Sequence, residues 1–246
     1  MNLAIDIGNT RAKLTPIDRG QAIDSLQIDL EAFDIPCLET LLAAYPTIDA
    51  AIAVSSSGPH ERIETWLAER MRRFIRFDSS VPVPIANRYA TPETLGADRL
   101  AAAVGAATLY PSRDVLIVDF GTAITFDLVS AKGEFLGGNI SPGATTRFRA
   151  LHRFTRSLPL CSLDEEIPAG RLGDSSRSAI VNGVANGIVY EVEGYIRDLE
   201  KKYDGLLTIF TGGESNFFAE RLKNTIFATY DLVAYGLNRI LEYNAK

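Results

Sequence analysis

A strand, a glycine turn and a second strand occur twice in this chain, and this repetition constrains the fold more than any other feature. The first copy begins at residue 3 and reads LAIDIGNTRAKL; the second begins at residue 115 and reads VLIVDFGTAITFD. Asp-x-Gly alone is a common turn signature, so coincidence is the alternative to duplication. The shared order of strand, turn, strand, turn and strand favours duplication. It predicts two similar α/β domains that face each other across a cleft.

The segments around these copies alternate between strand and helix patterns over the 246 residues. Apolar or alternating runs predict strands at 2–7, 11–17, 21–28, 50–56 and 206–213. Helical spacing and composition predict helices at 37–45, 59–74, 95–110, 180–199 and 231–243. Each copy of the repeat is followed by helices and a later strand. We therefore place the domains at residues 1–112 and 113–246.

Composition excludes several classes of function. The net charge of −6 argues against a general binder of nucleic acid or anionic membranes, because such surfaces are cationic. The arginine-rich run at 70–76 closes an expected amphipathic helix and is interpreted as a solvated face rather than a phosphate patch. Cys37 and Cys161 are widely spaced, which indicates a reducing cytoplasm, and with His60 and His152 they offer no plausible zinc site. No apolar run approaches the roughly 20 residues of a membrane-spanning helix.

The first glycine turn carries groups suited to phosphate. GxxxxGK[ST] is absent, and no GxGxxG follows the first strand, so neither a P-loop nor a dinucleotide fold is expected. Gly8 allows backbone N–H groups to approach an anion, Asn9 and Thr10 add donors, and Lys13 adds a positive charge. Asp6 can lie beside phosphate only with a cation between them, and magnesium is the usual one. The turn therefore suits a metal–nucleotide complex.

A third motif, TPETLGADRLAAA, places Asp98 and Arg99 at the start of an alanine-rich helix. By itself, an acidic residue there is explained by the helix dipole. Adjacent Asp and Arg side chains nevertheless point in different directions, so one can face an alcohol while the other binds a carboxylate. Phosphoryl transfer needs an acid group that orients the acceptor hydroxyl and charges that neutralise the transferred phosphoryl.

These motifs, in this order, resemble those of the type III pantothenate kinases within the acetate and sugar kinase/actin superfamily. DIGNT with Lys13 resembles the first phosphate motif, LGADR the substrate and catalytic motif, and DFGTAITFD through LGGNISPG the second phosphate motif. The late TGG at 211–213 matches a glycine pair after the last-domain strand. The resemblance implies two actin-like (ribonuclease H-like) domains with mixed sheets flanked by helices. It also implies phosphorylation of the primary alcohol of pantothenate, the first step of coenzyme A synthesis.

The family uses ATP, a divalent cation such as magnesium, and a monovalent cation, potassium or ammonium. Carried over by motif position, the resemblance makes Asp98 the base and Asp119 the ligand of the monovalent cation. It places ATP and magnesium at Asp6, Gly8, Asn9, Thr10, Lys13 and Thr122. It places pantothenate at Tyr89, Gly96, Ala97, Arg99 and Ser176. Ser176 stands where the family usually has threonine, so that contact keeps its hydroxyl and loses a methyl group.

The resemblance also implies a homodimer. Gly183, Gly187 and Gly194 on the long helix permit a close two-fold contact, although they could also pack within one subunit. Two other readings stay open: a non-catalytic regulatory protein on the same fold, and a kinase for another acceptor such as a sugar or acetate.

Overall fold

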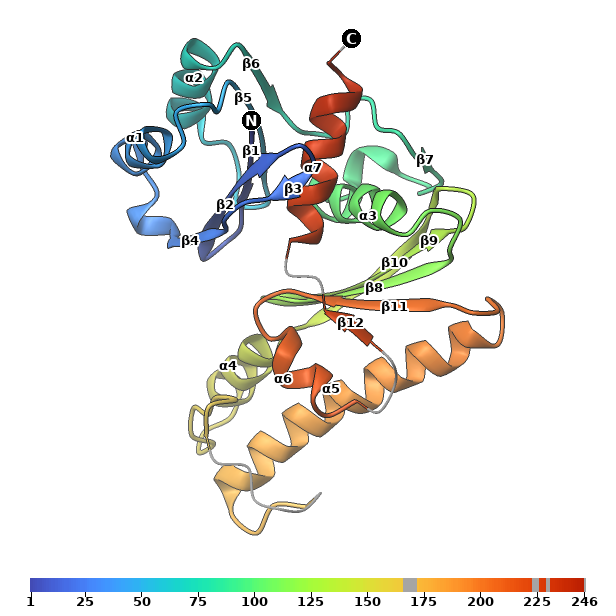
Figure 1. Ribbon diagram of the computed structural model, residues 1–246. Coiled ribbons are helices and arrows are strands. Elements are labelled where there is room, and N and C mark those ends of the chain that lie inside the picture. The colour runs from blue at the N-terminus through green and yellow to red at the C-terminus, as the bar shows by residue number, and fades with distance from the viewer. Residues whose placement is uncertain (166–171, 223–225, 229–230, 246) are drawn as a thin grey trace. The chain divides into compact units, whose positions relative to one another are not determined.

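The computed structural model describes residues 1–165, 172–222, 226–228 and 231–245 (Figure 1). The chain forms two compact units. The first comprises residues 1–115, 127–137 and 230–246, and the second comprises 116–126 and 138–229. The C-terminal helix therefore belongs to the same unit as the N-terminal sheet, although it lies in the second predicted domain. The division into domains at 1–112 and 113–246 stays a prediction.

The sheet of the first unit has the strand order β3-β2-β1-β5-β6, with β4 also paired to β2. Its central strand β1 is antiparallel to β2 and parallel to β5, and β5 is parallel to β6, so the sheet is mixed. The strands are β1 (Asn2–Ile7), β2 (Arg11–Asp18), β3 (Gln21–Ala22), β4 (Leu26–Asp29), β5 (Ala50–Ser55) and β6 (Arg73–Arg76). Because β1 and β5 are apolar on both faces, they need cover from helices on each side.

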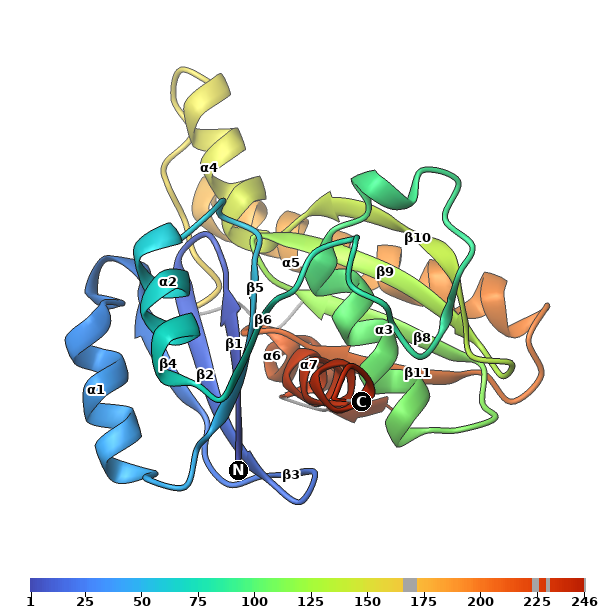
Figure 2. The same ribbon diagram turned by 90° about the horizontal axis from the view of Figure 1, so that it is seen from above.

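Helices supply that cover in two layers (Figure 2). The helices α1 (Ile35–Ala44) and α2 (Glu61–Arg70) bury apolar side chains, including Leu38 and Trp66, against one face of the sheet. The helices α3 (Ala97–Leu109) and α7 (Leu232–Tyr243) pack against each other, and α7 contacts β1 and β5. Short 3-10 turns, η1 (Leu30–Ala32) and η2 (Pro92–Thr94), precede α1 and α3. The catalytic motif predicted at the start of α3 is thus held by a packed helix pair.

The second sheet repeats the order of the first, reading β12-β11-β8-β9-β10-β7. In both sheets the first strand of the repeated motif, β1 or β8, is central. The next two strands of the motif lie on one side of it, β2 and β3 in the first sheet and β9 and β10 in the second. Two later strands lie on the other side, β5 and β6 or β11 and β12. The strands are β7 (Ala86–Asn87), β8 (Val115–Phe120), β9 (Ala123–Ser130), β10 (Glu134–Pro142), β11 (Leu207–Thr211) and β12 (Ile226–Ala228). This common order confirms the prediction of two similar mixed α/β sheets.

The helices of the second unit are α4 (Ala144–Phe154), α5 (Ser176–Glu200) and α6 (Ser215–Ala219). The long helix α5 begins with a capping box, in which the Ser175 and Ser178 side chains each accept from the other residue's backbone N–H. Its apolar side, which includes Ile188 and Val192, packs with Phe120 and Phe210 in the core of this unit. No helix within the described residues is both long and apolar enough to cross a membrane.

Two predicted elements differ from the structure. The strand expected at 21–28 is broken into β3 and β4, because its pairing with β2 shifts by one residue between them: Ile17 pairs with Ala22, but Leu14 pairs with Leu26. The helix expected at 59–74 ends at Arg70, and the following arginines form part of β6, an edge strand beside β5. Phe74 still follows the helical spacing of Leu67 and Met71, but the backbone from Arg73 pairs with β5 instead, so pairing with a neighbouring strand overrides the local helical pattern.

Candidate active site

The first glycine turn is a tight hairpin whose flanking side chains lie close together. Asp6 on β1 and Lys13 on β2 are direct cross-strand partners. The Gly8 N–H donates to the Arg11 carbonyl at 2.9 Å, and a Cβ on Gly8 would lie 3.2 Å from that oxygen. Asn9 and Thr10 are exposed at the tip, and Asp6 is half-buried. The hairpin therefore brings together the predicted residues for ATP and magnesium from the first motif.

Lys13 has a partner that sequence reasoning missed. Its ammonium forms an ion pair with Asp231, the N-cap residue of α7, and both side chains are mostly buried. The Ser25 hydroxyl also donates to Asp231, at 3.2 Å. A lysine that contacts phosphate would have to share its charge with this carboxylate. The sequence carried no signal for Asp231, because the contact joins residues at opposite ends of the chain.

The GADR motif forms the first turn of α3, as the sequence predicts. Gly96 is the N-cap, and a Cβ there would lie 2.6 Å from the Asp98 Oδ1 atom, so glycine leaves room for that carboxylate. The Asp98 Oδ1 atom accepts from the Arg99 N–H at 2.9 Å. Asp98 is half-buried, which leaves its carboxylate accessible to a substrate hydroxyl.

Arg99 is buried and paired with Asp127 on β9. Its Nε donates to the two carboxylate oxygens at 3.0 and 3.2 Å, and its Nη2 donates to Oδ1 at 2.5 Å. Burial alone would lower the pKa of the guanidinium, but the hydrogen bonds and charge of Asp127 raise it above its ordinary value, so Arg99 stays charged. Tyr89, the other predicted pantothenate contact, lies beside it, with its ring centroid 5.9 Å from the guanidinium carbon.

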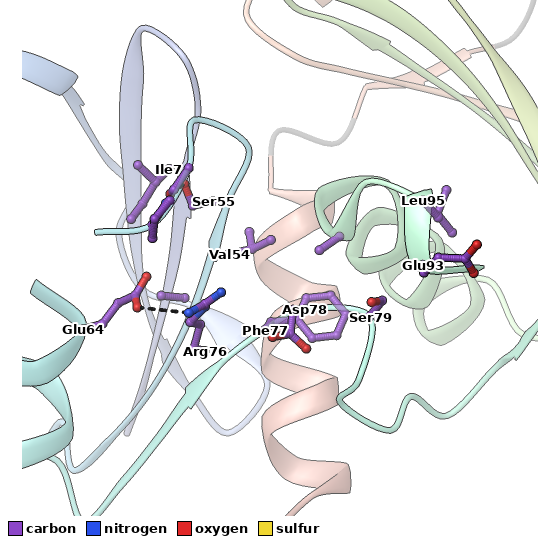
Figure 3. A pocket seen from close by; sticks show the side chains of 14 residues that line it. Ile7, Val54, Ser55, Glu64, Arg76, Phe77, Asp78, Ser79, Glu93 and Leu95 are labelled. Atoms are coloured by element: carbon purple, nitrogen blue, oxygen red, sulfur yellow. Dashed lines mark hydrogen bonds and ion pairs between the residues drawn. The ribbon is translucent and has the colours of Figure 1, made fainter. Parts of the chain in front are cut away.

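A pocket of about 260 Å³ lies at the carboxyl ends of β1, β5 and β6 and reaches the turn before α3 (Figure 3). Ile7, which follows Asp6, and Ala97, which precedes Asp98, both line it. Its charged lining residues are Glu64, Arg76, Asp78 and Glu93, and the Arg76 guanidinium lies 3.8 Å from the Glu64 carboxylate. The acidic excess makes this pocket a poor receptor for an anion by itself. Among the predicted pantothenate contacts, only Ala97 lines it.

In the second unit, Asp119 of the second phosphate motif lies close to Gly212, which follows β11. Gly212 has a φ of +91°, and a Cβ there would lie 2.4 Å from the Asp119 Oδ1 atom. Gly143, at the start of α4, donates its N–H to the Thr122 carbonyl at 3.0 Å, and the Thr146 hydroxyl donates to the same oxygen at 2.7 Å. Asp119 is therefore held against the TGG turn, while the N-terminus of α4 is fixed beside Thr122.

Ser176 and Glu214 are two further positions of interest in this unit. Ser176 is the exposed first residue of α5. Glu214, which follows the TGG turn, was not predicted as a site residue. Burial raises the pKa of its carboxyl group above the ordinary value, against the opposing hydrogen bonds from Thr145 and the Ala144 backbone. The spacing TGGE at 211–214 is the only signal that could have pointed to it.

No group of three or more histidine, cysteine, aspartate or glutamate side chains within the described residues is arranged to hold a metal ion. A magnesium ion bound beside Asp6 would therefore take most of its ligands from water and nucleotide phosphate, as this ion usually does. The half-buried carboxylate of Asp6, near the end of the central strand β1, is suited to this minor share of the ligands.

Comparison with solved structures defines the class of protein. A putative 2-dehydro-3-deoxygalactonokinase from Sinorhizobium meliloti superposes with a TM-score of 0.60 at 15% identity over 99% of both chains. A putative Baf family transcriptional activator from Campylobacter jejuni superposes with a TM-score of 0.62 at 21% identity over 98% of both. At such identities the likeness shows the fold alone. The chain therefore shares its fold, two mixed α/β sheets flanked by helices, with these two proteins, which agrees with the actin-like fold predicted from the sequence.

Sequence comparison identifies the family within that class. The family model for type III pantothenate kinase matches residues 2–198. The type III pantothenate kinase of Phocaeicola vulgatus is 43% identical over the full length of both chains. The chain therefore belongs to the type III pantothenate kinase family, and the resemblance drawn from the four motifs is confirmed. The individual site residues stay predictions.

Proposed function

We propose that this protein transfers the γ-phosphoryl group of ATP to the primary alcohol of pantothenate and forms 4′-phosphopantothenate, the first step of coenzyme A synthesis. The observation that carries this proposal is full-length membership of the type III pantothenate kinase family, with an intact GADR motif at the start of α3. Asp98 supplies the accessible carboxylate that such a transfer requires.

Asp98 is the general base. It takes the proton of the pantothenate hydroxyl as that oxygen forms its bond to the γ-phosphorus, while the bond from this phosphorus to the bridging oxygen of ADP breaks. A positioned base of this kind contributes about 10²–10⁴-fold to the rate. The room that Gly96 leaves beside the Asp98 carboxylate supports this role. Arg99 binds the carboxylate of pantothenate, and Tyr89, Gly96 and Ala97 line the same site; Ser176 is a further contact that the family resemblance implies.

The ATP phosphates bind at the first hairpin, and Thr122 is a further ATP contact that the family resemblance implies. The exposed donors of Asn9 and Thr10, and the charge of Lys13, suit phosphate oxygens. Asp6 holds a magnesium ion, in part through water, and this ion supplies neutralisation of phosphate charge when it is bound. Lys13 exchanges its ion pair with Asp231 for contact with a phosphate, or is shared between the two.

Asp119 holds the monovalent cation, potassium or ammonium. Its carboxylate lies against Gly212, where a Cβ would take up the space beside Oδ1. A large cation with weak ligand preferences fits a carboxylate surrounded by backbone, because carbonyl oxygens complete its coordination. The Phe120 carbonyl oxygen also lies near Gly212, where a Cβ would be 2.5 Å from it, and accepts from the Glu214 N–H at 3.3 Å.

The protein acts as a homodimer in the cytoplasm. A Cβ on Gly183 would meet no atom within 4 Å, and those on Gly187 and Gly194 would meet only an arginine side chain at 3.8 or 3.9 Å. One side of α5 is therefore open enough for the close approach of a second copy. The two cysteines Cys37 and Cys161 are free thiols, which fits a reducing compartment.

One assay tests the function. Purified wild-type protein is given ATP, magnesium, potassium and pantothenate, and 4′-phosphopantothenate is measured, with Asp98→Asn as the matched control. Product from the wild type and little from the variant is the expected result. No product from folded wild-type protein would refute the proposal and favour a regulatory role. Product only with a sugar or acetate as acceptor would reassign the substrate.

A further inference from the structure

The ion pair between Arg99 and Asp127 is the most deeply buried charge contact in the described part of the chain. The two side chains are 8% and 1% exposed. All three hydrogen bonds between them use Nε and Nη2, which form one edge of the guanidinium. The contact thus leaves the Nη1 nitrogen, on the other edge, outside the Asp127 interaction.

Aromatic rings restrict the same guanidinium further. The centroids of the Tyr89 and Phe135 rings lie 5.9 and 6.0 Å from its central carbon, and the two rings lie 6.0 Å apart. The hydrogen bonds of Nε and Nη2 to the Asp127 carboxylate fix the position and plane of the group, and the two rings lie beside it. An arginine that only filled space in the core would not need this arrangement, because apolar residues stabilise a core at least as well as a buried ion pair.

We propose that Asp127 is a positioning residue, which holds the Arg99 guanidinium so that its Nη1 edge meets the carboxylate of the substrate. This inference rests on the proposed function, in which Arg99 binds that carboxylate. An arginine side chain loses rotamer entropy when it is ordered. Because Asp127 and the rings order Arg99 during folding, substrate binding does not have to order it again.

Asp127 also sets the charge of the site. The pair is neutral before substrate arrives, so Arg99 offers oriented N–H donors rather than an unpaired positive charge. Selectivity for a carboxylate then depends on geometry, since the donors are directed at one point. Loss of the Asp127 charge should therefore reduce binding of pantothenate through loss of orientation, even though it removes a competing anion.

The test uses Asp127→Asn in the full-length protein, with Glu134→Gln as the matched control. Glu134 also forms an ion pair with an arginine, Arg88, but this pair is more exposed. In Asp127→Asn the KM for pantothenate should rise at least about tenfold, which corresponds to about 1.4 kcal/mol. The kcat and the KM for ATP should stay near their wild-type values, because Asp98 and the hairpin are untouched. The control should leave all three constants unchanged.

A substrate analogue separates positioning from a general structural role. Pantothenyl alcohol has a hydroxymethyl group in place of the carboxylate, so Arg99 cannot select it by charge-assisted hydrogen bonds. The inference predicts that Asp127→Asn lowers kcat/KM for pantothenate and not for the alcohol. An equal loss on both substrates, or an unchanged KM for pantothenate in folded protein, would overturn it.

A second variant keeps the test decisive if Asp127→Asn does not fold. Asp127→Glu retains the negative charge and moves it by one methylene group, which should displace the guanidinium and raise the KM for pantothenate selectively. A wild-type KM in Asp127→Glu would overturn the inference in that case. Absence of pantothenate phosphorylation in the wild type would instead refute the proposed function, so the two failures are distinguishable.

Discussion

Replacing Gly236 with alanine should separate α3 from α7 and disturb the start of α3. At the crossing of these helices, a Cβ on Gly236 would lie 1.8 Å from the Ala101 carbonyl oxygen. Gly105, which faces it on α3, is also too crowded for a side chain, since a Cβ there would lie 2.2 Å from the Leu232 carbonyl oxygen. Both obstacles are backbone atoms, so rotation of a side chain cannot relieve them.

The magnitude follows from these distances. Ordinary van der Waals contact begins at 3.4 Å, so the atoms at Gly236 must separate by about 1.6 Å. Overpacking of this kind costs about 1–3 kcal/mol and occasionally more. Alanine stabilises the helix by about 1 kcal/mol relative to glycine, because its helix propensity is higher. Because the obstacle is backbone, the cost should lie near the top of this range, about 3 kcal/mol, which leaves a net loss of about 2 kcal/mol in the free energy of unfolding.

Activity should fall as well, because Asp98 lies in the first turn of the displaced helix. A misplacement of about 1 Å in a catalytic group can cost roughly 100-fold in rate. Only part of the displacement is expected to reach the first turn, so kcat should fall about 10-fold to 100-fold.

Denaturant unfolding and steady-state kinetics check this prediction. The matched control is Thr108→Ala on the exposed side of α3, which should change the free energy of unfolding by less than about 0.5 kcal/mol. If Gly236→Ala unfolds like the control and keeps the wild-type kcat, the close crossing does not hold the catalytic turn, and the reasoning is refuted.

Three further predictions concern the site. Asp98→Asn should lower kcat about 10²–10⁴-fold while ATP binding, measured by calorimetry, is retained; wild-type turnover would mean that the base is misassigned. Gly212→Ala should weaken activation by potassium, because its Cβ would meet the Asp119 carboxylate; an unchanged potassium titration would contradict this. Burial raises the pKa of Glu214 above the ordinary 4.5, so the wild type should lose stability relative to Glu214→Gln as pH rises from 4 to 7 in denaturant unfolding. A pH-independent difference would show that its ionisation does not oppose folding.

Much of the fold could be predicted from the sequence because its signals are local. Strand alternation, helical spacing and glycine turns each extend over a few residues, and they located β1, β8 and α3 close to their observed bounds. The errors occurred where local signals compete. One expected strand is divided where its pairing with β2 shifts by one residue, and the helical spacing continues to Phe74 although the backbone from Arg73 pairs with β5.

The same distinction between local and distant contacts applies to the candidate site. Residues within one motif, such as Asp6 with Lys13 or Gly96 with Asp98, are neighbours along a hairpin or a helix turn, so their spacing in the sequence fixes their proximity. The ATP and pantothenate assignments depended on recognising several such motifs in order. Membership of the family, which the comparisons establish, is the conclusion that this order of motifs supports best.

The sequence by itself determined the strand–turn–strand repeat, the GADR helix start and the family. Tertiary structure alone decided that Asp127 binds Arg99, that Asp231 binds Lys13, and that the C-terminal helix packs on α3 within the first unit. The physical reason is the separation along the chain between the residues that interact. A turn or a cap is specified by residues within one or two helical turns, whereas the partner of a buried charge depends on which distant segments pack together. That choice is made only when the whole core forms.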